Sequence, residues 1–177
     1  MSFLQPSDFT GVNSQSTNTY TEDPLQLYID KYEPIYLQSL LGCDMYDDFV
    51  ADLLPTPAVT TSVPQDVKFL ALFNPFCIDD TYMSGCQHRS EGIKEMLKYF
   101  IFWEYARDNQ EQFAITGSTK NAFSNSELVS LSHTKLYRNY NLGIETYKAV
   151  QWYICDNPND YDYDNYNGID KQFTDWL

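Results

Sequence analysis

The strongest helical periodicity in the chain lies between residues 90 and 113. Apolar side chains recur there at the i, i+3, i+4, i+7 and i+8 positions of one helix face. They are Ile93, Met96, Leu97, Phe100 and Ile101. Phe102, Trp103 and Tyr105 widen this stripe, so much of the helix circumference is apolar. Such a helix is covered either by the rest of its own fold or by another subunit.

A second long helix is predicted for about residues 132–155. Its apolar stripe consists of Leu136, Tyr140, Ile144, Tyr147, Val150 and Ile154. Gly143 lies on the same side, where glycine costs about 1 kcal/mol relative to alanine unless a neighbour must approach closely. Between the two long helices, Thr116–Asn125 is predicted to be a polar loop.

Shorter helices are predicted before them. Pro24, with Asp23 as N-cap, begins a helix that ends before Gly42, a residue suited to the left-handed position after a helix. Pro34 predicts a kink or a restart within it. Asp44 is predicted to cap the next helix.

The stretch between residues 65 and 83 predicts two further short elements. Val67–Phe73 has a helical pattern, Asn74-Pro75 interrupts it, and residues 76–83 are taken as another helix. No series of alternating apolar and polar residues indicates strands. The predicted fold is therefore all-α, a small helical bundle with two long helices, an extended N-terminal arm and an acidic C-terminal tail.

Three segments make up this organisation. Residues 1–22 are polar and lack periodicity, so they are predicted to be an extended arm that is ordered by a neighbour. Residues 23–155 form the helical domain. Residues 156–177 form an acidic tail rich in aromatic side chains.

The charge restricts the possible partners. Lys and Arg number 11 against 25 Asp and Glu, which gives a formal net charge of −14. Electrostatic DNA binding requires cations that replace phosphate counterions, and here they are few and scattered. An acidic surface favours solubility, and it also suits a surface that DNA passes without adhering.

Targeting signals and disulfides are not expected. The N-terminus lacks the basic and apolar regions of a signal peptide, and no apolar run approaches the ~20 residues of a membrane helix. The four cysteines are scattered, so free thiols in a reducing cytosol are predicted.

Catalytic and metal-binding patterns are weak. Asp160, Asp162 and Asp164 match the first ligand positions of a calcium-binding loop. Lys171, however, occupies the position at which such a loop carries its bidentate acidic ligand. Cys77, Cys86 and His88 lack the paired spacing of a zinc site, and two buried cysteines beside an exposed histidine are the simpler interpretation. With no nucleophile elbow and no glycine-rich phosphate loop, we expect no enzyme activity, no metal and no cofactor.

Aromatic side chains are the positive signal. They make up 16% of the chain, and 15 of them are tyrosines, which combine apolar area with a hydroxyl and suit interfaces. The alternative is that the tyrosines line a small core and its rim. The predicted interface residues are Phe102, Trp103, Tyr161, Tyr163, Tyr166, Phe173 and Trp176.

The same regions carry a resemblance. Residues 99–110, YFIFWEYARDNQ, followed by GSTKN at 117–121, resemble the central helix and loop of small virion proteins of Bacteroidetes (crAss-like) phages. Residues 28–53 and 135–154 are similar to flanking blocks of those proteins. That group resembles the head–tail connector, or adaptor, proteins of tailed phages. The likeness covers roughly residues 24–156 and rests on helix spacing and aromatic positions.

The resemblance implies a structural virion protein at the portal–tail junction, assembled in the host cytoplasm. It implies a homo-oligomeric ring, dodecameric by family analogy, that contacts the portal protein and the tail or next ring proteins. DNA would pass through its lumen without sequence-specific binding, and no membrane is involved. The termini and the 116–125 loop would reach neighbouring rings. The alternative is an acidic cytosolic protein-binding module or DNA mimic.

Overall fold

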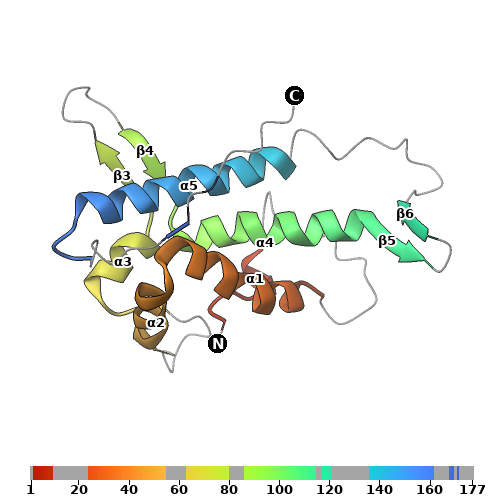
Figure 1. The fold of residues 1–177 in the computed structure, drawn as a ribbon, viewed down its shortest axis with the longest axis horizontal. Coiled ribbons are helices and arrows are strands. Elements are labelled where there is room, and N and C mark those ends of the chain that lie inside the picture. Colours follow the sequence, from red (N-terminus) through yellow and green to blue (C-terminus); the bar gives the residue numbers. More distant parts are fainter. Residues whose placement is uncertain are drawn as a thin grey trace.

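The computed structural model describes residues 2–9, 24–54, 63–79, 86–114, 117–120, 136–161, 168–169 and 171. This part of the chain is mostly helical (Figure 1). Its helices are α1 (Pro24–Leu41), α2 (Cys43–Asp52), α3 (Val67–Phe73), α4 (Ile93–Gln110) and α5 (Tyr137–Asp156), with a 3₁₀ turn at Pro6–Asp8. The predicted helical class is therefore confirmed.

The ends of the first helices follow local signals. α1 begins at Pro24 as predicted, and Gly42 follows its last residue with a φ of 77°. The predicted restart at Pro34 is wrong, since α1 continues through it. The predicted cap at Asp44 is also wrong: Gly42 is the N-cap of α2, and Asp44 lies in the first turn, where a carboxylate complements the helix dipole.

Three short antiparallel strand pairs interrupt the helical pattern. β1 (Leu53–Leu54) pairs with β2 (Val63–Pro64), β3 (Phe76–Asp79) with β4 (Cys86–Ser90), and β5 (Glu111–Ala114) with β6 (Gly117–Lys120). The helix predicted for residues 76–83 therefore begins as strand β3. The polar loop predicted at 116–125 lies partly in β6. These strands were missed because each is stabilised by its partner strand rather than by alternation along its own sequence.

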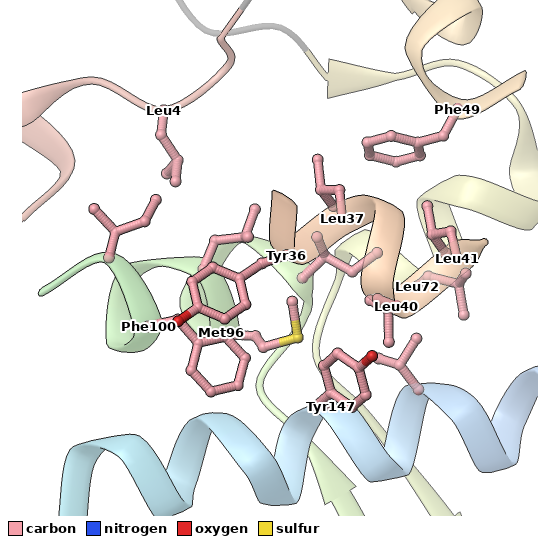
Figure 2. Packing of buried hydrophobic residues seen from close by; sticks show 14 of the residues in the cluster. Leu4, Tyr36, Leu37, Leu40, Leu41, Phe49, Leu72, Met96, Phe100 and Tyr147 are labelled. Atoms are coloured by element: carbon pink, nitrogen blue, oxygen red, sulfur yellow. The ribbon is translucent and has the colours of Figure 1, made fainter. Parts of the chain in front are cut away.

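The core lies where α4 packs between α5 and α1 (Figure 1). The apolar stripes predicted for α4 and α5 face each other there, and Phe100, Ile144, Tyr147 and Val150 are fully buried. Figure 2 shows Tyr36, Met96, Phe100 and Tyr147 gathered between the three helices. Neighbouring subunits are therefore not required to cover this face of α4.

Gly143 shows why α5 carries a glycine in its apolar stripe. A Cβ at this position would lie 2.9 Å from a ring carbon of Phe100, closer than side chains normally approach. The helical cost of glycine is therefore offset by the close packing of α4 and α5.

The N-terminal residues belong to the core. Phe3, Leu4 and Phe9 are at most 5% exposed, and Phe3 packs against Phe49 and Phe73. The prediction of an arm ordered by a neighbour is therefore wrong for residues 2–9. Residues 10–23 lie outside the described part of the chain.

The buried Glu33 anchors this segment to α1. One carboxylate oxygen accepts hydrogen bonds from the Ser2 hydroxyl (2.7 Å) and the Leu4 amide (3.2 Å), and the other accepts from the Phe3 amide (3.2 Å). Burial nonetheless raises the pKa of Glu33 above its usual range, and these hydrogen bonds only partly oppose it.

This shift has a pH consequence. The folded protein holds the Glu33 proton more tightly than the unfolded chain, so its contribution to stability is complete below the unfolded pKa and is lost as the pH rises through the folded pKa. Wild type should therefore gain stability relative to Glu33→Gln as the pH falls from 7 towards the ordinary glutamate value. Urea unfolding of both proteins across this range measures the difference. A difference that does not vary with pH would contradict the assignment.

The cysteines differ from the prediction. Cys43 and Cys155 are free, but Cys77 is disulfide-bonded and its residue is exposed rather than buried. The predicted free, buried thiol at Cys77 is therefore wrong. It sits in β3, which pairs with β4, and this pairing was not recognised from the sequence.

Candidate interaction surface

Aromatic side chains join α1 to α4 along one seam. Tyr28, Tyr32 and Tyr36 recur every four residues and therefore lie along one face of α1. The Tyr36 ring stacks on Phe100 with centroids 4.6 Å apart, and Tyr28 meets Tyr105 edge-on at 5.5 Å. Offset and edge-to-face contacts of this kind stabilise packing beyond the area they bury. Much of the tyrosine content therefore serves the fold.

Acidic side chains of α4 complete this seam. The Tyr36 hydroxyl donates to the buried Glu104 carboxylate at 2.7 Å, and the other oxygen of Glu104 pairs with Arg107. The Tyr28 hydroxyl donates to Asp108 at 3.1 Å. Burial and these carboxylates raise the pKa of Tyr28 to about 12 and that of Tyr36 further above its usual range. Both phenols therefore remain protonated donors that hold the helices together.

The two predicted interface residues on α4 are half-buried within the chain itself. Phe102 packs against the edge of the core. Trp103 contacts Tyr137 and Tyr140 of α5, with centroid distances of 4.9 and 5.3 Å. Only the exposed part of each ring remains available for contact with another molecule.

The predicted tail residues divide into two groups. Tyr161 is only 3% exposed, and its hydroxyl donates to the Lys68 carbonyl at 2.7 Å. Tyr161, which was predicted to lie at an interface, is therefore part of the core of the chain, because the chain turns back after α5 and packs it beside Tyr153. Tyr163, Tyr166, Phe173 and Trp176 lie outside the described residues.

Several large apolar side chains that were not predicted as interface residues are exposed. They are Leu27, Ile35, Val50, Val67, Trp152 and Ile169. Trp152 is 51% exposed on α5, where it meets the His88 ring at a centroid distance of 3.7 Å. Its position off the apolar stripe of α5 was the signal that could have identified it. Leu27 is 71% exposed on α1, and Ile35 follows it two turns later on the same face.

Hollows in the surface of the described residues lie next to Glu33 and next to α3. One next to Glu33 has a volume of about 190 Å³, below the roughly 300 Å³ at which small-molecule pockets begin. Another, of about 370 Å³, lies between α3 and the segment after α5 and includes the exposed Val67. The first hollow includes the Ser2 hydroxyl and the Glu33 carboxylate, whose hydrogen bond anchors the N-terminal segment.

Metal ligands do not converge in the described residues. Nowhere in that part of the chain do three His, Cys, Asp or Glu side chains come close enough to hold an ion. His88, considered above for zinc, lies instead against Trp152. Lys171, considered for the calcium loop, places its ammonium group over aromatic rings of the helical body.

None of the helices in the described segments combines the length and apolar character needed to cross a bilayer. Comparisons with protein families, with curated proteins and with solved structures found no match for this chain.

Proposed function

We propose that this chain is a structural virion protein that forms a ring at the phage portal–tail junction and passes DNA through its lumen. Its partners in this role are further copies of itself, the portal protein, and the tail or next ring proteins. The proposal rests on the resemblance of the α4 region and its flanking helices to connector proteins.

The exposed apolar side chains on the helices are the structural observation that supports it. Leu27 and Trp152 are each more than half exposed, although the core completely buries other leucine and aromatic side chains such as Leu40 and Phe100. Large aromatic and aliphatic residues left in water are typical of subunit contacts. The net charge of −14 favours passage of DNA over adhesion to it.

Two tryptophans provide a matched test of folding against assembly. Trp152→Ala should change the free energy of unfolding by no more than about 0.5 kcal/mol, because the side chain is exposed, yet it should weaken assembly. Trp103→Ala should cost about 2 kcal/mol, because this partly buried ring packs against Tyr137 and Tyr140 of α5. Urea unfolding and light scattering measure the two effects. If Trp152→Ala assembles as well as wild type, Trp152 is not part of the contact between subunits.

Mass measurement tests the proposal as a whole. Light scattering and native mass spectrometry of the protein, alone and mixed with the portal protein, should show a ring-sized oligomer or its complex with the portal. Mass spectrometry of purified virions should detect the chain at a stoichiometry that fits a ring. Its absence from virions would refute the proposal.

The alternative is an acidic module that binds a basic host protein or imitates DNA, and only the net charge favours it. That function predicts a monomer or dimer under the same conditions. It also predicts binding to a polycationic protein that weakens steeply with salt.

A further inference from the structure

The chain returns to the helical body at Ile169. Its amide donates to the Ser39 carbonyl at 2.7 Å. Ser39 lies in the last turn of α1, where carbonyls have no partner within the helix, so Ile169 caps α1. The Ile169 carbonyl accepts from the side-chain amide of Gln151 at 3.2 Å. The Tyr147 hydroxyl lies 2.5 Å from the Ile169 carbonyl oxygen and 2.6 Å from that of Ser39, so its single proton is shared between the two. The Ile169 side chain is 61% exposed, so the backbone rather than apolar burial makes this attachment.

Two positions later, the Lys171 ammonium group lies against three aromatic rings. Its nitrogen is 4.9 Å from the centroid of Tyr36, 5.6 Å from that of Tyr147 and 5.9 Å from that of Phe100. Each distance is within the reach of about 6 Å at which a ring face attracts a cation. The rings come from α1, α5 and α4, respectively, and together we call them the lysine cage.

Burial and a neighbouring carboxylate act in opposite directions on the charge of Lys171. Burial lowers the pKa of Lys171, and the Glu104 carboxylate opposes that effect. Glu104 is itself held by Tyr36 and Arg107, so its charge is fixed beside the cage. Lys31 offers a contrast: it lies 4.6 Å from the single ring of Tyr32, its sequence neighbour, and is exposed. The Lys31 contact is an incidental one between sequence neighbours on the surface, whereas the lysine cage forms only when three helices are packed together.

We infer that the lysine cage binds the positive charge of the Lys171 side chain and that this contact latches the C-terminal tail to the last turn of α1. The inference does not depend on the proposed function.

Amide hydrogen exchange in the full-length protein tests the latch. Lys171→Gln should speed exchange of the Ile169 amide roughly tenfold, because loss of the cation–π attraction opens the tail more often. Lys171→Arg, which keeps the charge and the affinity for rings, should retain most of the protection. Lys31→Gln is the matched control and should leave Ile169 unchanged. Amides in the middle of α4 should stay equally protected in all variants, which separates release of the tail from unfolding.

The proton chemical shifts of the lysine side chain give an independent measurement. The ε-methylene protons of Lys171 should be shifted upfield of those of Lys31, because three ring currents act on them. Equal shifts for the two lysines would overturn the inference. So would unchanged Ile169 exchange in Lys171→Gln, or equal loss of protection in the Gln and Arg variants, since the positive charge would then not hold the tail.

Discussion

Phe100→Ala is expected to lower the free energy of unfolding by about 3–5 kcal/mol, the range found when a buried phenylalanine is truncated. The side chain is completely buried, and its ring contacts Tyr36, Tyr140 and Tyr147. Truncation leaves a cavity where α1, α4 and α5 meet. Urea unfolding measures the loss. Phe102→Ala, on the same helix but half-buried, should cost clearly less.

Gly143 provides a second test of the packing around Phe100. In wild type, Gly143→Ala should be destabilising, because its new methyl group meets the Phe100 ring. In the Phe100→Ala background that ring is absent, so the same substitution should become neutral or stabilising through better helix propensity. A double-mutant cycle measures this coupling. Additive effects would contradict the direct contact between these two residues.

Gly92→Ala is expected to cost about 3 kcal/mol. Gly92 has a φ of 88°, which costs a side-chain-bearing residue about 1–2 kcal/mol, and its Cβ would lie 2.3 Å from the Phe73 carbonyl oxygen. Relieving that clash requires a backbone shift, and overpacking of this kind adds about 1–3 kcal/mol. Gly92 immediately precedes α4; the Ser90 hydroxyl accepts from the Gly92 amide, and the Gly92 carbonyl accepts from the Met96 amide.

Gly42 is the matched control for Gly92. With a φ of 77° and a ψ of 170°, it lies in a region that is essentially restricted to glycine, so Gly42→Ala should lose about 1–3 kcal/mol from backbone strain alone. Unfolding by urea compares the two variants directly. If Gly92→Ala loses no more than Gly42→Ala, the contact with Phe73 is not the cause.

Part of the candidate surface followed from sequence and part did not. Spacing placed Phe102 and Trp103 beside the main apolar stripe of α4, and the structure finds both half-buried against the body. Tyr161 was expected at an interface because its neighbours are acidic, yet it is buried. Trp152 was overlooked, although its position off the apolar stripe of α5 indicated exposure. Local composition reports only which residues are near in sequence, whereas burial depends on which distant residues the fold packs against a side chain.

Local sequence alone determined the helical class, the start of α1 at Pro24, its end before Gly42, and the inward faces of α4 and α5. These features depend on residues within one or two helical turns, where periodicity and capping act. Tertiary structure decided the rest. The packing of Phe3 against α2 and α3, the pairing of β3 with β4, and the contact of Lys171 with three helices all require contacts between distant segments. Ser39 and Tyr147, which together hold Ile169, are 108 positions apart, and only the packed helices bring them together.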